Sequence, residues 1–189
     1  MIYTDFVTRL HRGAYAVAIL VASSTAGYQA FGFAQNNSQA NVSRLPPEEE
    51  KESFDIWSTV LRIKEPGVTA WTIVQQTRGF ELCLKPAQDQ ESTYRPMFDD
   101  YAVKNKKGFV LERKFKLPVY TLVPPEAWGR SSARGTFAVV SAVGFNRERT
   151  RAVVCLWGSN SGTCYVLLYK GDGWQVDGDW RGSGCGWAA

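Results

Sequence analysis

Carboxylates, cysteines and aromatic rings are the side chains with which this 189-residue chain could do chemistry, because its only histidine is His11. His11 lies in an N-terminal segment that has the pattern of a signal peptide. Without a second imidazole, the rest of the chain cannot build a Ser-His-Asp or Cys-His nucleophilic system, or a zinc site that uses histidine. We therefore expect no catalytic residues of these classes and no cofactor.

Two close pairs of carboxylates are the remaining candidates for general acid–base catalysis, Asp99 with Asp100 and Asp177 with Asp179. Neighbouring residues on a helix point in different directions, and acidic residues in glycine-rich segments usually stabilise turns. We therefore expect neither pair to be catalytic. The alternative is a histidine-independent hydrolase that acts on cell-envelope glycans, which requires two carboxylates that converge within ~5–10 Å in one pocket.

The four cysteines are Cys83, Cys155, Cys164 and Cys185. None of them forms a C-x-x-C pair, so we expect no metal site and favour disulfides in an oxidising compartment. A two-residue turn at Ser159–Asn160 would place Cys155 directly opposite Cys164 on paired strands. Opposed residues at a non-hydrogen-bonded position have Cβ atoms ~4.5–5.5 Å apart, which is near disulfide reach. By elimination, Cys83 then pairs with Cys185 and ties the glycine-rich tail to an early strand.

Three of the seven tryptophans, Trp174, Trp180 and Trp187, lie in the glycine-rich tail. Such rings could form a platform for a sugar or peptide ligand. The earlier tryptophans in periodic apolar patterns are expected to pack in the core. Trp180 and Trp187 are less constrained by such patterns and are the candidates for contact with a ligand.

A basic stretch lies just after the middle of the chain. It consists of Lys104, Lys106, Lys107, Arg113, Lys114 and Lys116. Such a stretch could contact an anionic polymer, but Glu112 lies within it and the formal net charge of the whole chain is only +4. We therefore interpret it as a solvated surface and expect no nucleic-acid partner.

Two helices are predicted in the first half of the chain. The first begins at Pro46–Pro47, where proline is tolerated and acidic residues follow, and ends at Pro66–Gly67. The β-branched run Val68–Val74 follows as a strand, with Phe80–Leu84 as its hairpin partner. The second helix is predicted from about Arg95 to Lys104.

The last third of the chain is rich in apolar runs separated by turn residues. The runs are Phe137–Phe145, Arg151–Trp157, Cys164–Lys170 and Trp174–Trp180. Gly171–Gly173 is predicted to be a hairpin turn rather than a phosphate-binding loop, because a strand follows it. The order of elements predicts an α+β domain, in which two N-terminal helices pack on one face of a curved antiparallel sheet that ends in a four-stranded meander.

The N-terminus predicts export. Arg9 and Arg12 precede the apolar run Ala14–Ala22, and small residues suited to cleavage follow at Ala26 and Ala34. We predict a signal peptide over residues 1–34, a flexible leader over 35–45 and a single domain over 46–189. The protein would then be periplasmic or extracellular, without stable membrane insertion after cleavage.

A short pattern near the C-terminus consists of Ser-Ala-Val-Gly-Phe-Asn at 141–146, Thr-Arg-Ala-Val-Val at 150–154, Gly-Thr-Cys-Tyr-Val-Leu-Leu at 162–168, and Lys170, Gly173, Trp174 and Val176. This pattern resembles that of a group of uncharacterised exported bacterial proteins. The resemblance implies export and a β-meander, and it implies no particular reaction. The tail at 182–187 departs from the group's pattern, since it adds Cys185.

These features favour a non-enzymatic envelope or secreted domain over the carboxylate-pair hydrolase. Its ligand or partner, for which a glycan or a protein are the candidates, would bind the concave face of the sheet or the aromatic tail. The sequence does not identify that partner.

Export can be tested on protein purified from its native host. The charged start, the short apolar run and the small residues predict that the mature chain lacks Met1 through at least Ala26. Mass spectrometry of the intact protein gives its N-terminus. Recovery of the uncleaved chain from the cytosol would contradict both export and an oxidising environment.

Overall fold

A computed structural model describes residues 42–127, 136–158, 161–183 and 186–188, with side chains up to residue 183. The chain divides into two compact units, Met1–Asn37 and Ser38–Ala189, and all described residues belong to the second. The predicted signal peptide lies outside the described residues. Neither helix of the described part is long and apolar enough to cross a membrane.

Helix α1 spans Pro47–Lys64, as predicted from its terminal residues. Pro47 occupies the first helical position, and three glutamates follow it in the first turn, where negative charge stabilises the positive end of the helix dipole. Arg62 and Lys64 occupy the last turn. The chain then turns at Gly67, whose φ of 89° is readily adopted only by glycine.

One face of α1 forms a large part of the main hydrophobic core. Phe54, Trp57, Val60 and Leu61 are all buried in this cluster. The indole N–H of Trp57 donates a hydrogen bond of 2.9 Å to the carbonyl of Ser141. Because this bond joins a fully buried ring to a strand connection, it defines the rotation of the helix about its axis.

Helix α2 spans Glu91–Lys104 and begins about four residues before its predicted start, after a 3₁₀ turn at Gln88–Gln90. Its buried side chains are Tyr94, Met97, Phe98 and Tyr101. Tyr94 precedes the expected start and lies one turn before Met97 and Phe98 on the buried face. Tertiary packing of this tyrosine therefore extends the helix over a stretch with no capping signal.

The main sheet is mixed, in the order β10-β8-β7-β5-β2-β4. Its strands are β2 (Ala70–Val74), β4 (Val119–Val123), β5 (Phe137–Val140), β7 (Arg151–Gly158), β8 (Ser161–Tyr169) and β10 (Gly186–Ala188), with β6 (Gly144–Phe145) on β7 and β9 (Trp174–Val176) on β8. Strands β1 (Val42–Ser43) and β3 (Gly108–Phe109) form a separate parallel pair.

The predicted hairpin between β2 and Phe80–Leu84 is wrong. Strand β2 pairs in parallel with both β4 and β5, and these two neighbours occupy its edges. The backbone over 80–84 forms no strand. A parallel pairing joins segments that are far apart in sequence, so the local turn residues from which we predicted a hairpin carry no information about it.

The predicted meander is present as β5, β7, β8 and β9, each antiparallel to the next. Its first strand is divided into β5 and β6 by residues 141–143, and its last ends at Val176. Cys155 lies opposite Cys164 and Gly158 opposite Ser161, which is the predicted register.

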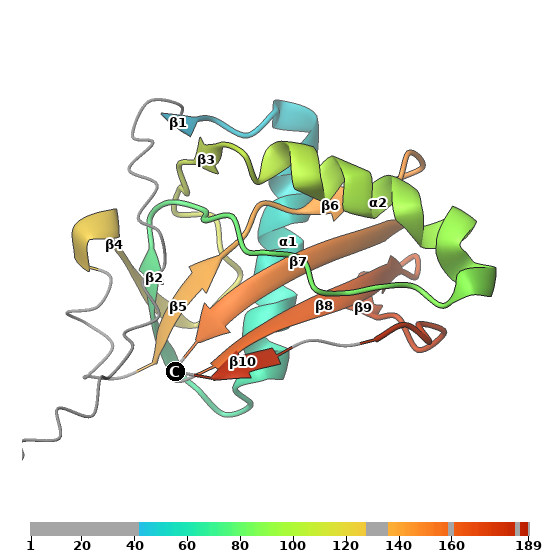
Figure 1. The fold of residues 1–189 in the computed structure, drawn as a ribbon. Coiled ribbons are helices and arrows are strands. Elements are labelled where there is room, and N and C mark those ends of the chain that lie inside the picture. The colour runs from blue at the N-terminus through green and yellow to red at the C-terminus, as the bar shows by residue number, and fades with distance from the viewer. Residues whose placement is uncertain (1–41, 128–135, 159–160, 184–185, 189) are drawn as a thin grey trace, which may run out of the picture. The chain divides into compact units, whose positions relative to one another are not determined.

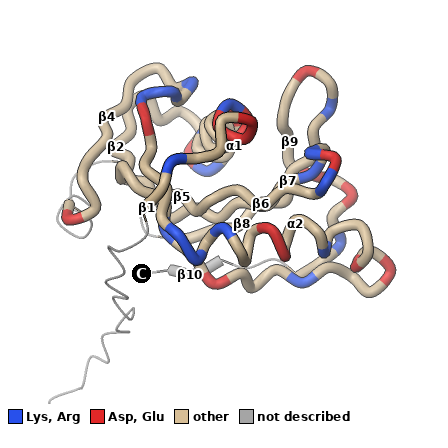
Figure 2. Tube along the Cα trace, turned by 90° about the horizontal axis from the view of Figure 1, so that it is seen from above, with Lys and Arg blue, Asp and Glu red and all other residues tan. Residues whose placement is uncertain are grey.

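The two helices lie on opposite faces of the sheet, and not on one face as the order of elements suggested (Figures 1 and 2). Ala152, Val154 and Leu156 of β7 belong to the cluster that contains α1. Val153 and Cys155 of the same strand belong to the cluster that contains α2. Strand β7 is therefore buried on both faces, so alternation of apolar and polar residues could not reveal which face a helix covers.

A close approach between α2 and β6 depends on Gly144. A Cβ atom at this position would lie 2.6 Å from Cβ of Tyr101 and 2.7 Å from its backbone nitrogen, and would also collide with the carbonyl oxygen of Met97. Because two of these three atoms belong to the backbone of a packed helix, a side-chain rotation cannot relieve the contact.

Substitution of Gly144→Ala should therefore lower the free energy of unfolding by about 3 kcal/mol, since α2 would have to move away from β6. Gly178→Ala is the matched control, because a Cβ at Gly178 meets no atom within 4 Å. The control should stay within about 1 kcal/mol of the parent. Urea unfolding of both variants measures the difference, and equal stabilities would contradict the close contact.

Candidate binding cleft

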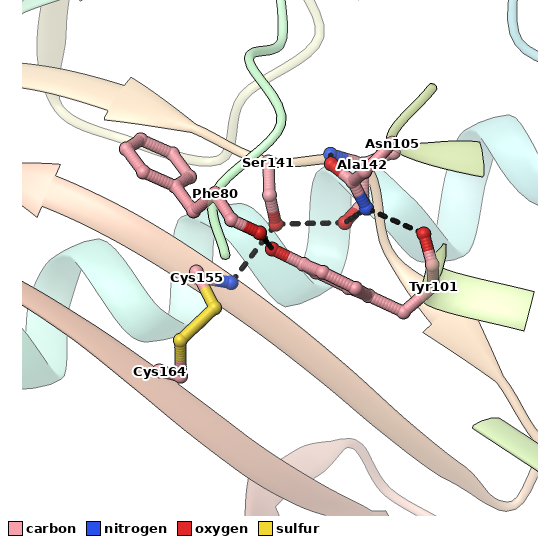
Figure 3. The surroundings of a disulfide bond; sticks show 7 residues. All are labelled: Phe80, Tyr101, Asn105, Ser141, Ala142, Cys155 and Cys164. Carbon is pink, nitrogen blue, oxygen red and sulfur yellow. Dashed lines mark hydrogen bonds between the residues drawn. A yellow bond between two sulfur atoms is a disulfide. The ribbon is translucent and has the colours of Figure 1, made fainter. Parts of the chain in front are cut away.

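The predicted disulfide between Cys155 and Cys164 is confirmed (Figure 3). The backbone N–H of Cys155 donates to Oγ of Ser141, and the carbonyl of Cys155 accepts a hydrogen bond from the N–H of Ser141. Both backbone groups of Cys155 therefore point away from β8. The two cysteines form a non-hydrogen-bonded pair, as the predicted turn required, and they lie in the core beneath α2.

The other predicted disulfide joins Cys83 to Cys185, and Cys185 lies outside the described residues. Its neighbourhood is described in part, because Lys85 and Ser183 form an antiparallel bridge in which the N–H of Ser183 donates to the carbonyl of Lys85 at 2.9 Å. The pairing of Cys83 with Cys185 stays a prediction.

Trp180, one of the two candidate rings for contact with a ligand, is half-buried against α2. Its ring packs edge-on against Tyr94 and Phe98, at centroid distances of 4.9 and 5.7 Å. Gly182 lies so close that a Cβ there would collide with the Trp180 ring. The side chain of Trp187 lies outside the description, and ligand contact by either ring stays a prediction.

The first carboxylate pair diverges. Asp99 is 70% exposed and forms an ion pair with Arg95 on the outer side of α2. Asp100 instead accepts a hydrogen bond of 2.8 Å from the backbone N–H of Phe145 and lies 2.6 Å from Lys104. The two carboxylates therefore interact with different neighbours. Neither of them lines either of the two cavities described below.

The second pair diverges as well. The carboxylate of Asp177 is fully buried and accepts hydrogen bonds from Tyr94 Oη at 2.9 Å and from the N–H of Asp179 at 3.0 Å, with Nε of Arg151 at 3.4 Å. Burial and the adjacent Asp177 carboxylate raise the pKa of Tyr94. Asp179 is exposed. Asp177 thus joins α2, β7 and the C-terminal segment, which is a structural role.

Three members of the basic stretch are neutralised by acids on α1. The side chains of Lys104, Lys114 and Lys116 form ion pairs with Glu49, Glu50 and Asp55 at 2.6, 2.7 and 2.6 Å, respectively. Glu112 adds a second carboxylate to Lys114, whose hydrogen bond lowers the pKa of Glu112. These three lysines therefore lie along α1, whereas Lys106, Lys107 and Arg113 are exposed. Within the described residues, no group of three histidine, cysteine or acidic side chains could hold a metal ion.

A cleft of about 570 Å³ lies between α1 and the hairpin that joins β8 to β9. Its lining combines basic, acidic, hydroxyl and aromatic side chains. These are Lys51, Asp55, Thr59 and Arg62 of α1, Lys116, and Tyr169, Asp172, Gly173, Trp174 and Gln175 of the hairpin. A volume of this size is typical of small-molecule sites in proteins.

The helical wall of the cleft follows from the periodicity of α1. Lys51, Asp55, Thr59 and Arg62 are spaced by three or four residues, so they form one stripe along the side that faces away from Trp57 and the core. At 1.5 Å per residue, the stripe extends about 16 Å along the helix axis.

Lys116 occupies a defined position against this wall. Its backbone N–H donates to Oγ of Ser58 at 2.8 Å, and its carbonyl accepts a hydrogen bond of 2.9 Å from Nη1 of Arg62. Its side chain pairs with Asp55 at 2.6 Å. Backbone and side chain of Lys116 are thus both held by α1.

The opposite wall carries two aromatic rings. Tyr169 and Trp174 are directly opposed at the base of the hairpin, and their ring centroids are 5.5 Å apart. Trp174 is buried, whereas Tyr169 is 44% exposed. The predicted turn is confirmed, since Gly171 has a φ of 60° and its carbonyl accepts a hydrogen bond from Tyr169 Oη at 3.0 Å.

The charges of the cleft are unevenly paired. Asp55 is paired with Lys116, but neither Lys51 nor Arg62 forms an ion pair with any described carboxylate. Asp172, at the exposed tip of the hairpin, is likewise unpaired within the described part of the chain. The helical wall therefore presents two cations whose charge no described side chain neutralises.

A second cavity, of about 330 Å³, lies between residues 79–82 and α2. Its lining includes Phe80, Leu82, Tyr101 and Asn105. Tyr101 Oη donates to the carbonyl of Phe80, and burial raises the pKa of Tyr101 to about 12. The phenol is therefore neutral and structural at ordinary pH, and this cavity has fewer charged groups than the cleft.

The sequence patterns do not identify most residues of the cleft as candidates for ligand binding. They indicate only Trp174, as an aromatic ring of the tail, and Lys116, as part of the basic stretch. The stripe of Lys51, Asp55 and Arg62 has a visible helical spacing, but the same spacing occurs on any solvated helix face. Only its position opposite the β8–β9 hairpin distinguishes it.

The structural role of Asp177 predicts a loss of stability on substitution. Asp177→Asn should lower the free energy of unfolding by about 2–4 kcal/mol, because the partly exposed Arg151 and the buried Tyr94 lose their charged acceptor. Asp179→Asn, which keeps the same backbone N–H, should change it by less than about 0.5 kcal/mol. Chemical denaturation distinguishes the two, and a neutral effect at Asp177 would contradict the assigned role.

The resemblance of residues 141–176 to uncharacterised exported bacterial proteins stays a prediction. The chain as a whole matches no protein-family model, no curated protein and no solved structure.

Proposed function

We propose that this chain is an exported, non-enzymatic domain that binds an anionic ligand in the cleft between α1 and the β8–β9 hairpin. One observation carries the proposal: Lys51 and Arg62, unpaired with any described carboxylate, share a cleft of about 570 Å³ with the exposed ring of Tyr169. Ligand sites in proteins are concave and combine aromatic side chains with a small number of polar groups that orient the ligand.

The charge pattern supports an anion as the ligand. Lys104, Lys114 and Lys116 are paired with carboxylates of α1, whereas Lys51 and Arg62 of the same helix are not. A guanidinium presents up to five donors, of which Arg62 uses one toward the Lys116 carbonyl. The remaining donors can bind a carboxylate, sulfate or phosphate group.

Binding is favoured over hydrolysis by the positions of the acids. Neither Asp99 with Asp100 nor Asp177 with Asp179 shares a cavity, as the two-carboxylate mechanism requires. Asp55 and Asp172 both line the cleft, but Asp55 is paired with Lys116 and Asp172 lies at the exposed tip of the hairpin.

Export is supported by two independent features. The N-terminal order of basic residues, apolar run and small residues is that of a signal peptide. The Cys155–Cys164 disulfide is of a kind that forms and persists in oxidising compartments.

The proposal can be tested with citrate, a small polyanion without rings. The double variant Lys51→Gln with Arg62→Gln should weaken citrate binding by about tenfold or more, because charge-assisted hydrogen bonds are lost. Nuclear magnetic resonance titration measures the affinity and should show shifts at Tyr169 and Trp174 in the parent protein.

The matched control removes the same two charges elsewhere, with Lys107→Gln and Arg113→Gln, both exposed residues outside the cleft. It should retain the parent affinity to within about twofold. Equal weakening in both double variants, or shifts remote from the cleft, would show that citrate responds only to net charge and would refute the site.

A further inference from the structure

Resting on the proposed function, we infer that the ligand of this cleft is an acidic oligosaccharide. Its carboxylates would bind Lys51 and Arg62, and one of its sugar rings would pack on Tyr169. The residues of the β8–β9 hairpin, which form the wall opposite α1, indicate this class of ligand.

The position of Tyr169 is defined before any ligand binds. Its hydroxyl donates to the carbonyl of Gly171, and its ring packs against Trp174 at 5.5 Å. Nevertheless 44% of the residue is exposed. An aromatic ring that is both oriented and exposed offers a face with negative charge density, which suits the weakly positive C–H face of a pyranose.

Trp174 contributes a hydrogen-bond donor to the same wall. The residue is 8% exposed and lines the cleft. Its indole N–H has no acceptor among the described residues and is not among their fully buried unpartnered atoms. The N–H is therefore open to water or to an acceptor on a ligand.

The acidic and neutral groups of the cleft distinguish a saccharide from other anions. Asp55 and Asp172 can accept hydrogen bonds from sugar hydroxyls, but they would repel the dense charge of a polyphosphate. Thr59 and Gln175 add further hydroxyl and amide groups. A lipid would leave these polar groups without partners, so hydroxyls and sparse negative charges together fit the lining best.

The spacing of the cations indicates an oligomer. Lys51 and Arg62 are separated by about 16 Å along the axis of α1. A single monosaccharide is too short to reach both, whereas an oligosaccharide with a carboxylate on each unit can bind the two cations at once. Tyr169 lies on the opposite wall, so the chain of sugars would run along the helix with one ring against the hairpin.

The test uses trigalacturonate, its fully methyl-esterified form and citrate as three probes of the full-length mature protein. Isothermal titration calorimetry should show that trigalacturonate binds at least about tenfold more tightly than the neutral ester, because esterification removes the charges that Lys51 and Arg62 bind. Tyr169→Ala should weaken trigalacturonate by about three- to tenfold and leave citrate within about twofold, because citrate has no ring to pack on Tyr169.

Tyr169→Phe is the conservative control, since it keeps the ring and should keep the parent affinity for trigalacturonate to within about twofold. Thermal unfolding of both variants shows whether the hairpin remains folded. Equal binding of trigalacturonate and its ester, or an unchanged affinity in a folded Tyr169→Ala variant, would overturn the saccharide inference while citrate still binds the cleft. Failure of citrate itself would instead refute the proposed anion site.

Discussion

Burial of one face of α1 is the constraint on which the rest of the structure depends. Phe54, Trp57 and Leu61 fill the core beneath the sheet, and the Trp57 indole bonds the carbonyl of Ser141. Because a helix has 3.6 residues per turn, fixing its apolar face against the core also fixes the direction in which the side chains of its opposite face point. The stripe from Lys51 to Arg62 therefore faces the β8–β9 hairpin as a consequence of core packing.

The acids of α1 have a related effect on the end of α2 and on the segment that follows it. Glu49 pairs with Lys104, the last residue of α2, and Asp55 pairs with Lys116, so both parts of the chain are aligned along α1. An exposed pair such as that of Lys116 with Asp55 contributes little stability, about 0–1 kcal/mol. The effect of both pairs here is positional, because they neutralise Lys104 and Lys116 and leave Lys51 and Arg62 as the unpaired cations of the helical wall.

The packing of α2 on the opposite face of the sheet also affects the position of residues near the cleft. The close contact of Gly144 with α2 sets the position of the next residue, Phe145, whose ring lies 5.9 Å from that of Trp174. Lys104 and Arg149 lie about equally far from the Phe145 ring, at 5.0 and 5.1 Å. A change in the packing of α2 would therefore be transmitted through Phe145 to the aromatic wall of the cleft.

Local patterns in the sequence determined those features whose causes lie within a few residues. The limits of α1, the Gly171–Gly173 turn and the register that joins Cys155 to Cys164 follow from dipole charges, from turn residues and from the alternation of paired strands. The tertiary structure alone decided the parallel neighbours of β2, the opposite placement of the two helices and the residues that form the cleft. Each of these depends on segments far apart in the chain, and a strand such as β7, which is apolar on both faces, carries no periodic signal of what will cover it.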